Sequence, residues 1–396
     1  MIGNIPDGWR VEKLKNIIHR AHQGINTAAD KVEFDFQGYP IIQTRNITSG
    51  VLHFDNIKYV NKNDWDLYKK KYQPKVNDIL LSNIGTIGKS VLINTTEDFL
   101  IHWNIFLIEP ITNLISPTFL KKYFDKLDNE NYYERFLKGG TVKFISKGFL
   151  SDLIIPIPPL LQQQKIVKVL DISSQLIEKQ KELITEYDLF LKSKFIEMFG
   201  DPINNPMGWE VVKLGKYGTL ARGKSAHRPR NAPFLYGGKY PFIQTGDITK
   251  GNSIYLKHYK QTYSEDGIKQ SRIFLKDTIA ITIAANIGDT KILSFDCYFP
   301  DSVVGFNVEN PLFVSSLFSY YKIKLEQRAT KTAQKNINLQ ILNNLDVLYP
   351  PIELQNKFAS IVENIETIKN QENQKLEHLE TLHKSLMDKA FRGEVI

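Results

Sequence analysis

The sequence predicts an α+β protein with two mixed α/β, strand-rich modules separated by two long antiparallel coiled-coil helices, in a pseudo-twofold tandem repeat. Three pairs of segments recur at spacings of 192 to 201 residues: Gly8–Leu14 and Gly208–Leu214, Tyr39–Thr48 and Tyr240–Thr249, Pro158–Ile166 and Pro350–Phe358. Glycine and proline are also absent from 160–199 and from 352–391. A period near half of the chain exceeds the roughly 20–50 residues of solenoid repeats, so a whole domain and its following segment are duplicated.

The composition favours a globular, cytoplasmic protein. Of 396 residues, 42% are hydrophobic and 11% aromatic, enough for each half to bury a core of its own. No run approaches the 18 apolar residues of a membrane span, and the first residues lack the apolar region of a signal peptide. The single cysteine, Cys297, excludes an intramolecular disulfide framework and a multi-cysteine zinc site.

The net charge of +8 is concentrated in the two modules. Counted along the sequence, residues 1–159 carry +3 and residues 200–351 carry +7, whereas the glycine-free and proline-free stretches together carry −2. A positive excess in the globular parts is suited to a polyanionic partner.

The order of apolar runs and turn residues sets the expected elements. We predict module one at 1–157, a central helix at 158–199, module two at 200–349 and a C-terminal helix at 350–396. Short strands are expected at Ile79–Ser82, Ser90–Ile93, Phe99–His102, Thr278–Ile283 and Lys291–Phe295, and helices at Pro117–Leu127 and Leu312–Gln327.

Heptad spacing in the two long helices predicts that they pair. Apolar residues recur every seven positions in two columns of each helix; the expected interface is Leu170, Ile177, Ile184, Leu191, Ile361, Ile365, Ile368, Leu379, Leu382 and Leu386, with a further column at Val169, Leu176, Leu183 and Phe190. Ser173, Gln180, Glu372 and Lys375 form polar layers, and His383 is expected to face solvent. The alternative is that each helix packs only on its own module.

These motifs together resemble the specificity (S) subunits of Type I restriction–modification enzymes, over essentially the full length. The marks are the Gly-Trp openings of both halves, the two helix entries and the two helix exits. The helix entries are Ile155–Pro159 with Gln163–Val167 and Tyr349–Ile352 with Gln355–Phe358. The helix exits are Phe195–Pro202 and Lys389–Val395.

The resemblance implies two target-recognition domains, each reading one half of a bipartite, asymmetric site in double-stranded DNA. It implies that the helix pair sets the gap between the half-sites and docks two methyltransferase (M) subunits, with restriction (R) subunits joining the assembly. S-adenosylmethionine, ATP and Mg²⁺ would then act on those partner chains, and this chain would hold no cofactor.

No motif in the sequence indicates catalysis or a metal site. The Pro-Pro pairs at 158–159 and 350–351 lack the amide and aromatic neighbours of an adenine methyltransferase, and no Walker loop is present. Asp289-Thr290-Lys291 has the short spacing of a nuclease motif without a clear upstream carboxylate, and we interpret it as a turn.

The residues expected to contact DNA combine base-reading side chains with glycine turns and cations. In module one they are Gln43, Thr44, Arg45, Asn46, Asn83, Thr86, Lys89, Lys138, Lys143 and Lys147. In module two they are Arg222, Lys224, Ser225, His227, Arg228, Arg230, Gln244, Thr245, Asn286, Lys331, Lys335 and Asn336.

Each of these groups has a structural alternative. Gln43 and Gln244 recur in both halves and equally suit a role in the fold, as do the glycine turns. The basic segment 222–231 is the densest in the chain, which favours a functional role. For the whole chain, the alternatives are a protein-interaction scaffold that uses the helices and a diverged stand-alone enzyme on nucleic acid.

Overall fold

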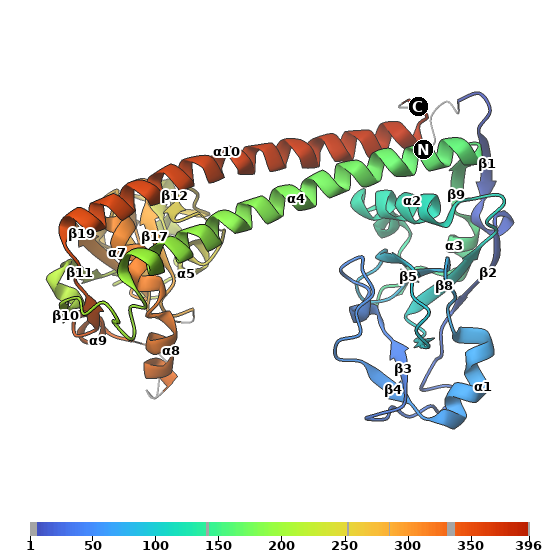
Figure 1. Ribbon diagram of the computed structural model, residues 1–396, viewed down its shortest axis with the longest axis horizontal. Helices are drawn as coiled ribbons and strands as arrows, with labels where there is room; N and C mark the ends of the chain where they lie inside the picture. Colours follow the sequence, from blue (N-terminus) through green and yellow to red (C-terminus); the bar gives the residue numbers. More distant parts are fainter. Residues whose placement is uncertain (1–5, 140–141, 252, 285, 331–336, 395–396) are drawn as a thin grey trace. The chain divides into compact units, whose positions relative to one another are not determined.

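The computed structural model describes residues 6–139, 142–251, 253–284, 286–330 and 337–394. The chain divides into two compact units (Figure 1). Unit 1 contains 1–179 and 376–396, and unit 2 contains 180–375. Each unit therefore consists of one module and one half of each long helix, α4 (Leu160–Phe199) and α10 (Ile352–Phe391).

Three sheets form the module of unit 1, with strand orders β2-β8-β5-β6, β4-β3-β7 and β1-β9. The strands are β1 (Arg10–Lys13), β2 (Ile18–Gln23), β3 (Tyr39–Ile42), β4 (Lys58–Val60), β5 (Ile79–Ser82), β6 (Ser90–Leu92), β7 (Leu100–Ile101), β8 (Ile105–Pro110) and β9 (Ile154–Ile157). The helices are η1 (Leu14–Asn16), η2 (Thr44–Asn46), α1 (Lys62–Tyr72), α2 (Pro117–Asn129), η3 (Tyr132–Phe136) and α3 (Lys147–Asp152). Strand β5 has the predicted bounds, and α2 begins at the predicted residue.

The module of unit 2 repeats these sheets and adds a strand to two of them. The orders are β11-β19-β16-β17-β13, β14-β12-β18-β15 and β10-β20. The strands are β10 (Val211–Lys213), β11 (Gly218–Arg222), β12 (Tyr236–Phe242), β13 (Tyr255–Leu256), β14 (Gln261–Tyr263), β15 (Ile273–Phe274), β16 (Ile279–Thr282), β17 (Thr290–Leu293), β18 (Cys297–Tyr298), β19 (Val303–Val308) and β20 (Asp346–Leu348).

The helices of this module differ from the expectation in one place. They are η4 (Leu214–Lys216), η5 (Pro233–Leu235), α5 (Thr245–Ile248), α6 (Glu265–Lys269), α7 (Pro311–Ser319), α8 (Lys322–Thr330) and α9 (Leu339–Asn343). The single helix predicted at Leu312–Gln327 is two helices, interrupted at Tyr320 and Tyr321. The Tyr321 hydroxyl donates a hydrogen bond to the carbonyl of Pro202, which anchors the interruption in the core.

In each unit, one hydrophobic core joins the module to the long helices. In unit 1, Phe119 and Tyr123 of α2 pack on Phe391 of α10, in a core that includes Leu170 of α4. In unit 2, Phe313 of α7 lies among Phe195, Phe199 and Phe358. A second core of unit 2 encloses Cys297 of β18. Burial raises the pKa of its thiol. That cysteine is therefore held in its unreactive thiol form.

Both long helices have a buried glutamine in their first turn. The Gln163 side-chain amide donates to the Pro158 carbonyl over 2.8 Å, and the Gln355 amide donates to the Pro350 carbonyl over the same distance. Both side chains are buried. A spacing of 192 residues therefore relates the two helices, as it relates Phe199 and Phe391 at their ends.

Within each unit the halves of α4 and α10 pack together as an antiparallel pair. In unit 1, Ser173 contacts His383 with 2.7 Å between the hydroxyl and Nδ1. In unit 2, Gln180 donates to Glu372 over 2.7 Å, Lys369 reaches Asp188, and Phe195 packs edge-on against Phe358. Residue numbers fall along α10 as they rise along α4, which confirms the predicted direction of pairing.

The buried face of each helix corrects part of the predicted interface. On α4, Leu170, Ile177 and Ile184 are buried and Leu191 is half-buried, as expected, but the neighbouring column of Leu176, Leu183 and Phe190 is exposed. On α10, Ile365 is buried and Leu379 and Leu386 are half-buried. Ile361 and Ile368 are half-buried as well, and Leu382 is exposed. The predicted polar layers at Ser173, Gln180 and Glu372 lie in the seam, whereas Lys375 is exposed. Lys369 and His383 of α10 also contact α4 there.

His383 therefore belongs to the seam, which corrects the expectation that it faces solvent. Ser173 donates its hydroxyl to the Leu170 carbonyl and contacts the His383 ring. Burial lowers the pKa of His383, and Lys122 lowers it further while Asp125 raises it.

Among the described residues, no helix combines the length and the apolar character that a membrane crossing requires.

Candidate nucleic-acid interface

The three segments predicted to contact DNA in module one lie next to one another in the fold. We call residues 83–89 loop one; it follows β5. The Thr44 hydroxyl donates to the carbonyls of Ile84 and Asn104, which joins η2 to loop one. Ile84 also forms a β-bridge with Phe144, and the Ile145 amide donates to the Asn83 carbonyl. The basic segment 138–147 therefore borders loop one on its other side.

Loop one is shaped by the side chain of Ser82 and by a glycine. The Ser82 hydroxyl donates to the Thr86 carbonyl and accepts from the Lys89 amide, and the Gly88 amide donates to the Ser82 carbonyl. Gly88 has a φ of +91°, and a Cβ there would lie 2.6 Å from the Tyr133 ring, so only glycine fits. These contacts leave Thr86 at the exposed tip of the loop.

Exposed side chains surround this tip. Arg45, Lys138, Lys143 and Lys147 are exposed, and Gln43 is half-buried. Lys89 is half-buried and forms an ion pair with Asp128 of α2, with 2.7 Å between Nζ and Oδ2. Asp128 was not predicted from the sequence, because no motif links residues 39 positions apart.

Three predicted contact residues of module one are buried, which corrects the expectation that their side chains face a ligand. Thr44 uses its hydroxyl inside the chain, and Asn46 caps η2 through the Gln43 amide and donates to the Asp55 carbonyl. Asn83 is fully buried, and among the described residues neither its amide nitrogen nor its oxygen has a hydrogen-bond partner. The corresponding position of module two is Ile283, which is also buried.

Module two repeats this loop, which we call loop two, at residues 283–289, of which all but residue 285 are described. The Thr282 hydroxyl donates to the Asn286 carbonyl and accepts from the Asp289 amide, and the Gly288 amide donates to the Thr282 carbonyl. Asn286 is exposed, at the position of Thr86. Asp289 forms an ion pair with Lys322 of α8, which the sequence analysis also missed.

The other predicted contacts of module two occupy matching places. Gln244 is exposed and donates to the Gln261 side chain over 2.6 Å, while Thr245 is half-buried at the start of α5. The Ile337 amide donates to the Ile283 carbonyl, as Ile145 does to Asn83 in module one. Lys331, Lys335 and Asn336 lie outside the described residues.

The basic segment 222–231 uses part of its charge within the fold. The Arg228 guanidinium donates to the carbonyls of Ser225 and His227 over 2.7 Å, and Arg230 forms an ion pair with Asp301 over 2.7 Å. Ser225 contacts the Tyr263 hydroxyl, and the His227 amide donates to Gln270.

Lys224 and Arg222 are exposed, although Arg222 also donates to the Asp301 carbonyl. Arg272, which the motif search missed, adds an exposed cation that donates to the Arg222 carbonyl.

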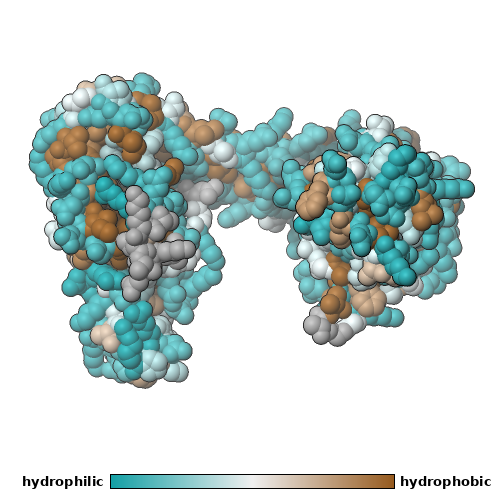
Figure 2. Space-filling view, turned by 90° about the horizontal axis from the view of Figure 1, so that it is seen from below, coloured by the Kyte–Doolittle hydropathy of each residue, from teal (hydrophilic) through white to brown (hydrophobic). Residues whose placement is uncertain are grey.

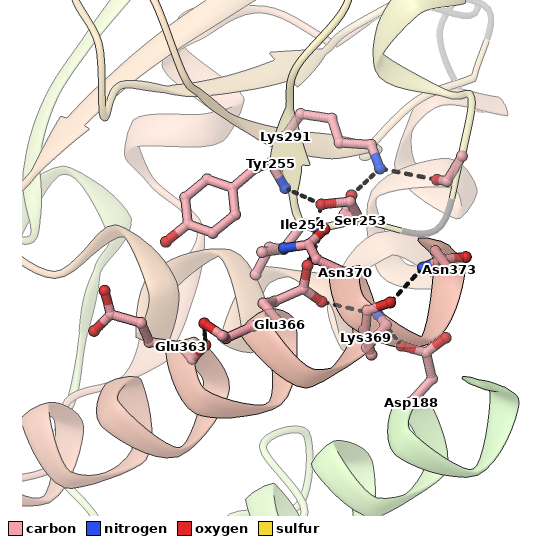
Figure 3. A network of polar contacts seen from close by, with 12 residues as sticks. Asp188, Ser253, Ile254, Tyr255, Lys291, Glu363, Glu366, Lys369, Asn370 and Asn373 are labelled. Carbon is pink, nitrogen blue, oxygen red and sulfur yellow. Dashed lines mark hydrogen bonds and ion pairs between the residues drawn. The ribbon is translucent and has the colours of Figure 1, made fainter. Parts of the chain in front are cut away.

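A buried polar network ties module two to the long helices within unit 2 (Figure 3). Lys369 of α10 donates to Asp188 of α4 over 2.6 Å and to Glu366 over 2.8 Å. Glu366 in turn accepts from the Ser253 hydroxyl and the Ile254 amide. Burial alone would lower the pKa of Lys369, but the hydrogen bonds to Asp188 and Glu366 outweigh it and raise the pKa.

Lys291 of β17 lies next to this network and donates to the carbonyls of Gly251 and Ser253. Burial lowers its pKa. Lys291 is therefore a structural cation. The triplet predicted as a turn instead joins the end of loop two, at Asp289, to the first two residues of β17. A cavity of about 360 Å³ borders the network, between α4, α7 and α10.

The surfaces of the two units are predominantly hydrophilic, with hydrophobic residues in small groups among polar ones on the face shown in Figure 2. Among the residues whose placement is described, no group of three or more His, Cys, Asp or Glu side chains is arranged to hold a metal ion.

The two modules hold equivalent loops through the same hydrogen bonds but expose different residues at the loop tips. Each module is also joined to one half of each long helix. The chain is therefore a duplicated recognition protein. The chain matches the Type I restriction modification DNA specificity domain twice, over residues 6–186 and 206–379. It therefore belongs to the family of Type I restriction–modification specificity subunits.

Full-length relatives and solved structures agree with this assignment. The chain is 28% identical to a putative Type I restriction enzyme MjaX specificity subunit of Methanocaldococcus jannaschii, over 100% of this chain and 95% of that protein. It is 20% identical to the EcoKI specificity subunit of Escherichia coli K12, over 99% and 90%. The crystal structure of the M. genitalium S subunit matches the fold with a TM-score of 0.55 at 15% identity, over 98% of this chain and 96% of that one.

A further structure, which concerns complex assembly and conformational transition of the type I R-M system, matches with a TM-score of 0.61 at 17% identity. The alignment covers 99% of this chain and 100% of that chain. At these identities the structural matches show the shared fold.

Proposed function

We propose that this chain is the subunit that gives a Type I restriction–modification complex its DNA sequence specificity, with each module reading one half of a bipartite, asymmetric site. The observation that carries the proposal is the pair of equivalent loops. Both are held by the same Ser82 or Thr282 hydroxyl contacts, and both expose one polar tip, Thr86 or Asn286. Threonine and asparagine differ in the base edges that they read, so the two half-sites differ.

The charges around loop one support phosphate binding on either side of the base-reading tip. Arg45, Lys138 and Lys143 are exposed cations on the segments that border the loop. Cations that contact phosphates position a protein on the duplex, while the tip supplies the sequence preference. In module two, Lys224, Arg222 and Arg272 have the same role.

The long helices fix the gap between half-sites and bind the methyltransferase subunits. Antiparallel packing of α4 on α10 within each unit supports this role. Leu176, Leu183 and Phe190 recur every seven residues on α4 and are 41–49% exposed, a stripe of the kind that a partner helix covers.

The chain itself has no catalytic role in this proposal. Two methyltransferase subunits and restriction subunits assemble with it on double-stranded DNA, in the cytoplasm. S-adenosylmethionine, ATP and Mg²⁺ belong to those partner chains, which carry adenine-N6 methylation and ATP-dependent cleavage.

The test is single-molecule methylome sequencing of a host that carries this chain with its cognate methyltransferase subunit. Deleting the chain should abolish N6-methyladenine at one split, asymmetric motif. Replacing residues 200–349 with the second module of another family member should change one half of that motif and leave the other half intact. An unchanged methylome with an active methyltransferase subunit would overturn the proposal in favour of the interaction scaffold.

A charge-reversal variant separates the proposal from the scaffold alternative. Lys138→Glu with Lys143→Glu should weaken methylation at every site that carries the motif, because both side chains are exposed beside loop one. Full retention of methylation would contradict the assignment of module one to DNA. A purified chain that methylated or cut DNA alone would instead support the stand-alone enzyme.

A further inference from the structure

We propose that the ion pairs Lys89–Asp128 and Asp289–Lys322 are positioning devices that hold the recognition loops of the two modules with opposite polarity. The inference rests on the proposed function, because it concerns how the two tips, Thr86 and Asn286, are presented to DNA. It adds four positioning residues that lie outside the loop tips and the cationic segments.

The loops are equivalent in the two modules, and so is the helical segment beside each loop, which is continuous as α2 in module one and divided into α7 and α8 in module two. Position 89 corresponds to position 289 at a spacing of 200, which also relates β5 to β16. Asp128 corresponds to Lys322 at a spacing of 194, which also relates Pro117 to Pro311 at the starts of α2 and α7. In both modules the ion pair therefore joins the same two places in the fold.

The two pairs match in burial while their charges are exchanged. In module one the cation Lys89 is on the loop, with 37% of its side chain exposed, and Asp128 of α2 is 20% exposed. In module two the anion Asp289 is on the loop, 24% exposed, and Lys322 is 37% exposed. A contact kept in place while its polarity is reversed indicates that the attraction between loop and helix matters, whichever sign the loop carries.

The loop residue of each pair also belongs to the hydrogen-bond frame of the loop. The backbone amide of Lys89 donates to the Ser82 hydroxyl, and that hydroxyl donates to the carbonyl of Thr86 at the tip. Asp289, Thr282 and Asn286 make the same chain of contacts. Displacing the side chain at position 89 or 289 therefore disturbs the tip through two hydrogen bonds.

Anchoring of the loop and direct phosphate binding are two different roles for Lys89, and they place different requirements on its charge. If Lys89 binds a phosphate, its positive charge at that position is required. If it is an anchor, an aspartate there works equally well once position 128 carries the cation. Asp289 already occupies the equivalent loop position in module two, where an anion cannot attract a phosphate.

The experiment compares Lys89→Asp, Asp128→Lys and the exchange K89D/D128K in the full chain with its methyltransferase subunit, by methylome sequencing. Each single variant places like charges together. We expect a loss of discrimination of up to roughly fivefold, which corresponds to about 1 kcal/mol at tenfold per 1.4 kcal/mol. The loss should be confined to the half-site of module one, and the exchange should restore the wild-type motif.

The matched control is R20E/E109R with its two single variants. Arg20 and Glu109 form a pair of similar exposure, 30% and 28%, at the end of β8 away from Ser82. These variants should leave the motif unchanged. The reciprocal set, Asp289→Lys, Lys322→Asp and D289K/K322D, should alter only the half-site of module two.

Several outcomes would overturn the inference while leaving the proposed function intact. One is that the wild-type chain sets a split motif and the single variants discriminate between sites as well as the wild type does. Others are an exchange variant that stays impaired, which would assign Lys89 to phosphate binding, and an equal loss at both half-sites, which would indicate a general loss of stability. If the wild-type chain sets no motif at all, the proposed function itself fails.

Discussion

The two units share one plan but differ in which contacts between their elements are charged. Unit 2 joins its module to the helices through the buried ions Lys369 and Glu366, whereas the equivalent positions of unit 1 are Ile177 and Ser174. Conversely, unit 1 has a polar layer of Ser173 and His383 where unit 2 has Ile365 and Leu191. Shape is therefore the property kept between the repeats, and polarity at a given place varies.

Polar groups in a seam cost stability and define which layers can meet. The polar layers of the two units fall at different levels of the helix pair, with Ser173 in unit 1 and Lys369 in unit 2. A helix pair with apolar residues at every layer would pack equally well in shifted registers. We infer that the unequal layers fix one register of α4 against α10. Three substitutions that copy residues of one repeat into the other test whether polarity at a given place matters.

The largest effect is expected from Lys369→Ile, which copies residue 177 of unit 1 into unit 2. It leaves Glu366, with a side chain 4% exposed, without its cation. Breaking a buried ion pair from one side costs about 3–5 kcal/mol of unfolding free energy. The measurement is the urea midpoint of the full chain.

The control is E366Q/K369I, in which a neutral amide still accepts from Ser253 and Ile254. It should recover most of the loss, since the buried carboxylate is removed together with its cation. Equal destabilisation of the single and double variants would contradict the view that the unpaired carboxylate is the cause.

A smaller and opposite effect is expected from Asn83→Ile, which copies Ile283 into module one. The Asn83 amide is buried without a hydrogen-bond partner among the described residues, and such a group costs about 1–3 kcal/mol. The variant should raise the thermal midpoint, whereas Ile283→Asn should lower it. An altered methylation motif in the variant would show instead that the Asn83 amide acts in recognition.

The smallest effect is expected from S173I/H383L, which copies the Ile365 and Leu191 layer into unit 1. Because burial lowers the pKa of His383, the native state favours the neutral ring, and the unfolded chain binds a proton first as the pH falls. The stability contributed by His383 is therefore complete above its unfolded pKa, near 6.5, and is lost as the pH falls through the lower folded pKa.

The variant should reduce the slope of the unfolding free energy against pH in the acid range. The comparison is between urea midpoints of the wild type and the variant at pH 7.5 and in steps below pH 6.5. Parallel curves for the two proteins would show that His383 does not titrate differently in the folded chain.

Much of the fold could be predicted because duplication and periodicity are properties of the sequence itself. The helices, their antiparallel pairing and β5 follow from this. The second column of the seam was wrong because a heptad count identifies apolar columns and not which of two neighbouring columns faces the partner. Ser173 and Gln180 were predicted as polar layers of the seam, but His383 was not, since hydropathy does not mark a histidine as interior.

The candidate site was less predictable. Its cationic segments were visible as local runs, but that η2, loop one and 138–147 lie next to one another was not predicted from the sequence. The orientation of Thr44, Asn46 and Asn83 depends on tertiary packing, which residue type does not encode. Asp128 and Lys322 pair with residues 39 and 33 positions away, and no periodic pattern marks such contacts.

The opposite polarity of the two loop anchors has a consequence for any recombination between the two repeats. Two similar repeats in one gene are open to recombination with each other and with relatives. An exchange that carries a whole module transfers loop and helix together and keeps each anchor complete. A crossover between β6 and α2 would instead join Lys89 to Lys322, or Asp289 to Asp128, and set like charges against each other. The anchors thus favour the inheritance of recognition modules as intact units.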